Sequence, residues 1–328
     1  MTTRTTNEMG LPLQAGDTVT HRGISVTPLF PTTDPVAQYV SLATAAAQGF
    51  TVKEVDDDGS VGELLVTNPT PHRVLLYDGE EVLGAKQNRI INMAVLVEAG
   101  ATLGVPVSCV EAGRWNWQTD EFTRAGRAPS PDVRRAKAEH MREAPTRRGV
   151  AQSAVWDAVE LKEMQHGFSS PTSSHGDLIE QQRPQIEELA RAFAPQPGQC
   201  GMVLGMDGRI SCMDAVSRPD VWADLHQALL TGYMLDALPA VGRAPAPDGA
   251  VGEFLAAVAG ATRTAGPAAG LGTDLRLAGD RVVGSGLDLD GELLQVTAFV
   301  SDGTGDDGLE VSISVSPPRI ARPSRRRV

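Results

Sequence analysis

The chain has 328 residues, of which 41% are hydrophobic and 21% charged, so it can form one large globular domain or two modest ones. Its formal net charge of -12 argues against a nucleic-acid partner, because phosphate backbones require a basic surface. Three widely spaced cysteines argue against a disulfide framework, and the sequence shows no metal-ligand spacing and no apolar run of membrane length. These features predict a cytoplasmic protein with no metal site, no cofactor and no membrane partner.

The first third of the chain is predicted to be mostly sheet. Residues 1–15 are expected to be a disordered N-terminus, and 16–121 the β-rich part of one domain. Residues 16–30 are typical of two strands that turn near Arg22-Gly23, and residues 36–50 of an Ala-rich helix. The other strands expected here are a hairpin within 50–68 and single strands within 72–84, 89–100 and 102–113.

Residues 122–149 differ in character, since they hold eight Lys or Arg residues, three acids and three prolines. A helical pattern covers residues 131–143, but so many bases with few apolar residues are difficult to bury. The pattern therefore predicts a basic linker whose stretch from Arg124 to Arg148 is exposed and cut early by trypsin.

The rest of the chain is mostly helical and then returns to strands. We expect the following elements: helices within 150–168, 178–194, 217–238 and 252–261, a hairpin within 200–217, and strands within 281–315. Ser217 is a candidate cap for its helix. Residues 150–316 would complete the same domain, and 317–328 would be a disordered Arg-rich tail.

This order of elements predicts an α+β fold. The expected core is a largely antiparallel, sandwich-like sheet built from residues 16–114 and 281–315, with a helical insertion packed against it. Strands do not alternate with helices, so a doubly wound parallel sheet is disfavoured.

A group of polar side chains precedes an apolar run in the stretch "GEEVLGAKQNRIINMAVLVEAG". Lys86, Gln87, Asn88 and Arg89 offer ammonium, amide and guanidinium donors in four consecutive residues, which suits an anionic ligand. The competing interpretation is a solvated turn. Asn92 lies inside the apolar run, where it is either hydrogen-bonded in the core or directed into a site.

A second group lies in "CVEAGRW". Glu111 and Arg114 flank a glycine, and they either pair with each other or bind a ligand together. For Cys109 a buried, unreactive thiol is favoured over a nucleophile. Trp115 and Trp117 either cover the core, which is favoured, or stack on a base.

The polar loop "SSPTSSHGD" contains two further candidates. His175 and Asp177 could be a base and the carboxylate that orients it, but no nucleophile motif accompanies them. A loop that caps the following helix is the favoured interpretation.

The segments "GEE-x-x-GAKQNR" and "PVSCVEAGRW" resemble the ARPP-1 domain family, named for its association with ADP-ribosylglycohydrolases and rhodanese-phosphatase-type proteins. The resemblance is strongest over residues 66–115 and covers most of 16–300. It implies a connection with ADP-ribose or NAD-derived metabolites. Family members often carry His where this chain has Gln295, so any chemistry that needs this His is in doubt here.

These observations lead to a hypothesis of one polar pocket where the two segments meet on neighbouring strands. Its ligand-binding residues would be Lys86, Gln87, Asn88, Arg89, Asn92 and Arg114, and its ligand a small anionic metabolite. A second hypothesis is a hydrolase in which Glu81 or Glu111 is the general acid or base and Lys86 stabilises charge. A third is a non-catalytic scaffold, and a fourth is a buried ion-pair network that only fixes the fold. A homo-oligomer is compatible with all four hypotheses.

Overall fold

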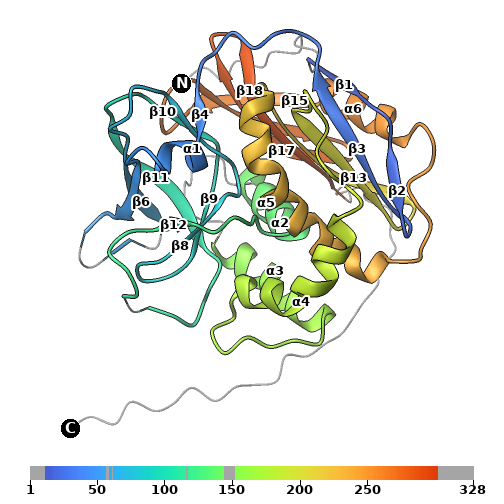
Figure 1. Cartoon of the computed structure of the whole chain (residues 1–328), viewed down its shortest axis with the longest axis horizontal. Helices are drawn as coiled ribbons and strands as arrows, with labels where there is room; N and C mark the ends of the chain where they lie inside the picture. Colours follow the sequence, from blue (N-terminus) through green and yellow to red (C-terminus); the bar gives the residue numbers. More distant parts are fainter. Residues whose placement is uncertain (1–11, 57–58, 61, 116, 144–151, 302–328) are drawn as a thin grey trace.

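The computed structural model describes residues 12–56, 59–60, 62–115, 117–143 and 152–301. The described residues form three sheets and six α-helices, and their strand pairings are antiparallel except for that between β4 and β7 (Figure 1). The predicted α+β class is therefore confirmed. No helix in this part of the chain is both long and apolar enough to cross a bilayer.

The largest sheet has nine strands in the order β1-β3-β13-β14-β18-β17-β16-β15, with β2 paired to β3. Its strands are β1 (Leu13–Ala15), β2 (Val19–His21), β3 (Ile24–Pro31), β13 (Gly201–Met206), β14 (Arg209–Val216), β15 (Thr262–Pro267), β16 (Thr273–Gly279), β17 (Val282–Leu289) and β18 (Glu292–Val300). Two sequence-distant parts of the chain thus join in one sheet, because β3 pairs with β13.

The other two sheets come from the N-terminal half. The six-stranded sheet has the order β12-β8-β9-β11-β6-β5, and the three-stranded sheet the order β10-β7-β4. The strands are β4 (Val40–Ser41), β5 (Thr51–Glu54), β6 (Glu63–Thr67), β7 (Val74–Leu76), β8 (Glu81–Leu83), β9 (Arg89–Ile91), β10 (Val95–Val97), β11 (Thr102–Cys109) and β12 (Thr123–Arg124).

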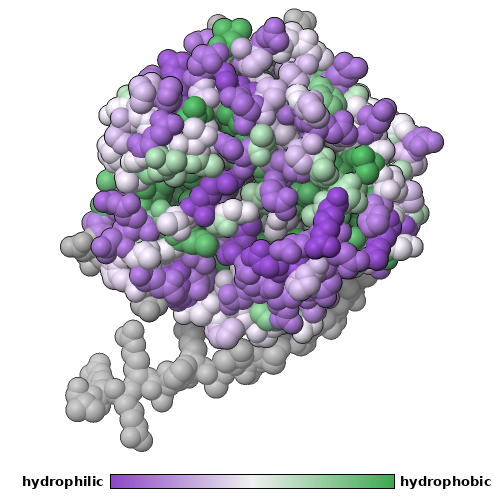
Figure 2. Space-filling view, viewed as in Figure 1, coloured by the Kyte–Doolittle hydropathy of each residue, from purple (hydrophilic) through white to green (hydrophobic). Residues whose placement is uncertain are grey.

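Three of the six described α-helices cover the two faces of the nine-stranded sheet. The six helices are α1 (Leu42–Ala46), α2 (Pro131–Glu143), α3 (Gln152–Gln165), α4 (His175–Ala190), α5 (Pro219–Ala237) and α6 (Ala250–Gly260), with a 3₁₀ turn at Leu238–Ala240. Helices α2 and α5 contact one face of this sheet, and α6 contacts β14 and β16. Hydrophilic side chains predominate on the surface over α3 and α4, which lie outside this layer (Figure 2).

Two tight turns agree with the sequence. Arg22-Gly23 joins β2 to β3, and Asp207-Gly208 joins β13 to β14, with all four residues at positive φ. Positive φ at both central residues is the geometry that twists two strands into a hairpin.

Several local predictions are wrong. The helix expected within 36–50 is reduced to α1, because β4 and its parallel pairing with β7 occupy Val40–Ser41. Residues 72–84 and 89–100 each form two strands rather than one, and the members of each pair lie in different sheets. Ser217 does not cap α5, since Arg218 is the N-cap residue and the Ser217 hydroxyl bonds Tyr39 instead.

The chain ends and the strands also need correction. Leu13–Ala15 forms β1, so the predicted disorder does not extend over these residues, and residues 1–11 lie outside the described part. The strands β15 and β16 come before the predicted return to sheet at 281. Residues 302–328, including the predicted tail, are also outside the described part.

The predicted exposure of residues 124–148 is wrong where the structure describes this segment. Helix α2 lies against the nine-stranded sheet, and Arg134 and Lys137 are only 1% and 2% exposed. Both are buried because each has an acidic partner in the core: Asp214 for Arg134 and Asp78 for Lys137. Residues 144–149 lie outside the described part.

Candidate functional site

The six-stranded sheet brings the two polar segments of the sequence together. β8 pairs with β9 and β9 pairs with β11, so that Glu81 lies opposite Ile90, and Arg89 opposite Cys109. The loop between β8 and β9 turns at Gly84 and Ala85, which have φ values of 135° and 38°. A side chain at Gly84 would collide with Thr119 and Glu121, so glycine is required at this close approach.

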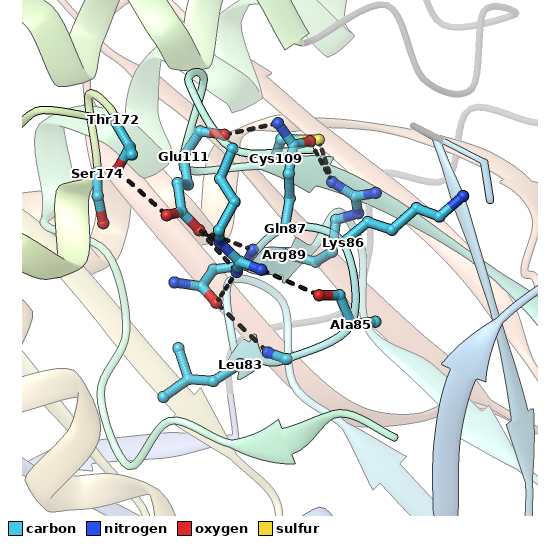
Figure 3. Close-up of polar contacts among 12 residues, drawn as sticks. Leu83, Ala85, Lys86, Gln87, Arg89, Cys109, Glu111, Thr172 and Ser174 are labelled. Carbon is cyan, nitrogen blue, oxygen red and sulfur yellow. Dashed lines mark hydrogen bonds and ion pairs between the residues drawn. The ribbon is translucent and has the colours of Figure 1, made fainter. Parts of the chain in front are cut away.

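Glu111 is the centre of a buried group of contacts that we call the Glu111 network: Gln87, Asn88, Glu111, Arg114 and Thr172. The Glu111 carboxylate accepts hydrogen bonds from Arg114 Nε at 2.8 Å, from the Asn88 backbone N–H at 3.3 Å and from Thr172 Oγ1 at 3.2 Å (Figure 3). Gln87 Nε2 donates to the Glu111 carbonyl oxygen at 2.8 Å. Of the two alternatives for Glu111 and Arg114, the structure thus shows the pair.

Arg114 ties this network to the β8–β9 loop. Its guanidinium donates to the Ala85 carbonyl and to Asn88 Oδ1, both at 3.0 Å. Glu111 and Arg114 are only 6% and 7% exposed, so the contacts form in a site with little water. Such charge-assisted hydrogen bonds hold the two segments in one fixed arrangement.

The loop before α4 closes the other side of Glu111. Ala112 and Gly113 donate backbone hydrogen bonds to Ser173 and Thr172, and Ser174 caps α4 by accepting from the Asp177 N–H. The prediction of a capping loop is thus confirmed. Burial lowers the pKa of His175 to about 3, so this imidazole is neutral at ordinary pH.

Glu81 and its neighbour Glu80 lie in two separate ion pairs. Both oxygens of Glu81 contact Arg127, each at 2.9 Å, and Glu80 contacts Arg124 at 2.6 Å. Burial raises the pKa of both carboxyl groups, while the two arginines oppose this shift. The arginines of the segment predicted to be a basic linker therefore neutralise the two glutamates of the motif.

Arg89 is completely buried and fixed by several acceptors. Its Nη1 donates to Gln87 Oε1 at 2.7 Å and also contacts the Cys109 sulfur, while Nη2 lies 3.7 Å from Glu54 Oε1. Burial raises the pKa of Cys109 to about 11, which keeps the thiol protonated. The favoured expectation of a buried, unreactive thiol is thus supported.

Lys86 has a different environment from its neighbours in sequence. Its side chain extends away from Glu111 (Figure 3), and its Nζ lies 5.5 Å from the ring centroid of Trp115 and 5.3 Å from that of Trp117. Arg89 Cζ is 5.4 Å from the Trp115 centroid. We call Lys86, Trp115 and Trp117 the tryptophan surface.

Both indoles of this surface are half exposed. Trp115 and Trp117 each have 46% of their surface accessible, so the expectation that they cover the core is wrong. Large aromatic side chains usually bury most of their area, so two exposed neighbours beside a cation form an unusual surface.

The predicted residues therefore fall into several sets of contacts, which Arg89 links through Gln87 and Trp115. Gln87, Asn88, Glu111 and Arg114 form the Glu111 network, Lys86 belongs to the tryptophan surface, and Glu81 pairs with Arg127. Asn92 is 1% exposed, and neither of its amide atoms has a hydrogen-bond partner in the described part of the chain, so it does not join the network. Among the described residues, no three His, Cys, Asp or Glu side chains are placed to hold a metal ion.

Sequence reasoning missed three partners of this site: Glu54, Arg127 and Thr172. Each comes from a separate segment of the chain, and none belongs to a recognisable motif. Only the excess of bases after Phe122 hinted at partners for the acidic motif.

The chain matches the model of a known family. The family model for ARPP-1, the ARG and Rhodanese-Phosphatase-superfamily-associated Protein domain, matches residues 12–299. Neither curated proteins nor solved structures give a match.

Proposed function

The chain belongs to the ARPP-1 family, and from this premise we propose that it binds a small anionic molecule with an aromatic base, of the ADP-ribose type. The ligand would lie on the tryptophan surface. The observation that carries this proposal is the position of Lys86 Nζ, 5.5 and 5.3 Å from two half-exposed indole rings.

The chemistry of this surface suits the two parts of such a ligand. An indole face stacks on any nucleobase, and this contact contributes about 1–3 kcal/mol per base. The ammonium group of Lys86, which is 8% exposed, and the fully buried guanidinium of Arg89 lie beside the indoles and give this surface positive charge that would attract phosphate groups. The family name adds an association with ADP-ribosyl enzymes, which supports a ligand of this class.

The buried residues support this surface in a structural role. Arg89 is fixed by Gln87, Cys109 and Glu54, and the Glu111 network fixes the β8–β9 loop that carries Lys86. A cation held in place loses little conformational freedom when it meets a ligand, which favours binding.

Hydrolysis by Glu81 or Glu111 is the second candidate function, because burial raises the pKa of Glu81, as a general acid requires. However, both Glu81 oxygens are bound to Arg127, and the Glu111 carboxylate accepts three hydrogen bonds. A group with every oxygen occupied cannot readily exchange a proton with a ligand, so binding without turnover is the favoured function.

The test is calorimetric titration with ADP-ribose, AMP and ribose 5-phosphate, followed by chromatography of the recovered ligand. We expect ADP-ribose and AMP to bind and to remain intact, with Trp117→Ala weakening both by about tenfold or more, since about 1.4 kcal/mol corresponds to tenfold. Lys86→Met should weaken all three phosphates. Ribose 5-phosphate has no base, so Trp117→Ala should affect it little.

Two control variants are available. Trp156 on α3 is 37% exposed, and Lys53 forms an exposed ion pair with Glu121, so Trp156→Ala and Lys53→Met remove the same side-chain types elsewhere. Consumption of the ligand would favour the hydrolase instead. A failure of all three compounds to bind would favour a non-catalytic scaffold and contradict the proposal.

A further inference from the structure

A pocket lies on the nine-stranded sheet and shares no residue with the tryptophan surface. It has a volume of about 910 Å³ and is bordered by β1, by residues 33–38 and by the turn between β17 and β18. This volume is within the range of about 300–1,000 Å³ that is usual for small-molecule sites.

The inner wall of this pocket is apolar. Leu13, Leu289, Leu293 and Val296 contribute to it, and Leu13 and Leu293 are partly exposed although they pack on the hydrophobic cluster beside α6. Aliphatic side chains that remain partly exposed inside a concave site favour a ligand with an apolar body.

Arg263 on β15 is the one buried cation among the described residues of this wall. It is 5% exposed, and its Nη2 has no hydrogen-bond partner within the described residues. Four arginines are buried among all the described residues of the protein. The three other than Arg263 are Arg89, Arg114 and Arg134, and each has a carboxylate within 4 Å. Burial lowers the pKa of Arg263, and Asp288 only partly opposes this effect. A buried guanidinium with an unsatisfied donor is costly, so an incoming anion would be favoured here.

The acidic residues of the pocket limit the charge of that anion. Asp34 and Asp290 are exposed and line the pocket, so they would repel a second negative group. Glu292 also lines it, but its carboxylate accepts hydrogen bonds from the backbone N–H groups of Val36 and Ala37. Asp288, which lies near Arg263 but does not line the pocket, accepts at Oδ1 from the Gly291 N–H, and its Oδ2 has no hydrogen-bond partner among the described residues. The second cation of the lining, Arg73, is paired with Glu98, so one negative charge on an otherwise apolar molecule fits these surroundings best.

We propose that this pocket binds an aliphatic monocarboxylate, with its head group at Arg263 and its chain along Leu13, Leu293 and Val296. The site is separate from the tryptophan surface, and neither depends on the other. The carboxylate would accept the hydrogen bond that Arg263 Nη2 does not make within the described residues.

The test is titration of the full chain with decanoate, using 1-decanol and decanedioate as comparisons, read by calorimetry. We expect decanoate to bind at least tenfold more tightly than either comparison compound. Arg263→Met should remove this preference for decanoate over decanol, while Arg243→Met, which removes an exposed arginine paired with Asp207, should leave it unchanged.

A second variant keeps the test decisive if Arg263→Met does not fold. Leu293→Trp adds volume at a partly exposed position of the wall and should weaken the binding of decanoate and of decanol together.

The melting temperature gives an independent readout for Arg263→Met. This variant should have an equal or higher melting temperature than the parent chain, because it removes a buried charge with an unsatisfied donor. The absence of decanoate binding, or equal binding by the parent chain and both pocket variants, would overturn the proposal.

Discussion

Two regions of the protein bury charged side chains, and they differ in whether the charges lie next to an exposed surface. In the first region Arg89 lies beside the half-exposed Trp115 and is joined to the Glu111 network through Gln87. The second region, between the nine-stranded sheet and helices α2 and α5, is closed. We call it the inner network, and its members are Tyr77, Asp78, Arg134, Lys137, Asp214, Tyr233, Ser285 and Thr297.

In the inner network the buried charges serve to hold elements of the fold together, and Asp214 is at its centre. Asp214 is fully buried and accepts hydrogen bonds from Tyr77 at 2.6 Å, from Tyr233 at 2.8 Å and from Arg134 at 2.6 and 2.7 Å. Burial raises the pKa of both tyrosines well above the ordinary value, so they remain protonated donors. This arrangement fixes α2 and α5 on the sheet.

The comparison teaches that buried charge alone does not mark a binding site. Both regions contain paired carboxylates and arginines, but only the first places a cation beside exposed aromatic faces. Gln295 is also buried, at 1% exposure, and lies on the same sheet as the inner network.

The largest expected effect comes from breaking the inner network. Asp214→Asn should reduce the free energy of unfolding by about 3–5 kcal/mol, because it leaves the Arg134 guanidinium buried without a counter-charge. Urea denaturation at pH 7 measures this loss. Asp220→Asn is the matched control, since Asp220 pairs with Arg218 at a side-chain exposure of 62% and should change stability by less than about 1 kcal/mol. Equal losses in the two variants would contradict the assignment of a structural role to Asp214.

The next largest effect is a loss of protein stability in acid that is caused by His175, which lies beside the Glu111 network. The folded-state pKa of His175, about 3, is below its ordinary value of 6.5, so the folded state binds fewer protons. This contribution to stability is present above pH 6.5 and is lost as the pH falls toward the folded pKa. Between pH 7 and 5 the parent chain should lose about 2 kcal/mol relative to His175→Gln, at about 1.4 kcal/mol per pH unit below about 6.5.

Urea denaturation of both chains at pH 7, 6 and 5 checks this pH dependence. The same change at the exposed His72 is the control and should give curves parallel to those of the parent chain. Parallel curves for His175→Gln and the parent chain would mean that this imidazole takes up a proton equally in the folded and unfolded states.

A smaller loss is expected within the Glu111 network itself. Glu111→Gln keeps an acceptor for Thr172 but removes the charge opposite Arg114, and hydrogen bonds to charged groups contribute about 1.5–3 kcal/mol. We expect a loss of about 1–2 kcal/mol, measured by urea denaturation. Glu121→Gln, at an exposed pair with Lys53, should cost less than about 1 kcal/mol and is the control. A loss as large as that of Asp214→Asn would show that the two regions do not differ.

The sequence predicts the parts of the fold that depend on local pattern. The hairpin turns at Arg22-Gly23 and Asp207-Gly208 and the helix over 131–143 follow from residues adjacent in the chain. A local pattern cannot show where the chain passes from one sheet to another, as it does between β7 and β8 and between β9 and β10. Periodicity reports which side chains are buried but not which strand they pair with.

The candidate site was predictable to a similar extent. The chemistry of Lys86, Arg89 and Arg114 follows from their types, but their environments depend on distant partners such as Glu54, Arg127 and Thr172. The exposure of Trp115 and Trp117 could not be predicted, because hydrophobicity alone places an indole in the core.

The smallest expected effect on protein stability comes from a substitution in the tryptophan surface. Trp117→Ala should reduce the free energy of unfolding by less than about 1 kcal/mol, because the indole is half exposed and its cation–π contact with Lys86 contributes about 0.5–1 kcal/mol. Trp222→Ala is the reference, since Trp222 on α5 is 1% exposed and its truncation should cost about 3–5 kcal/mol. Urea denaturation of the two variants gives both values. A small loss for Trp117→Ala together with weaker nucleotide binding would identify a surface maintained for a ligand, whereas a loss approaching that of Trp222→Ala would make Trp117 part of the core.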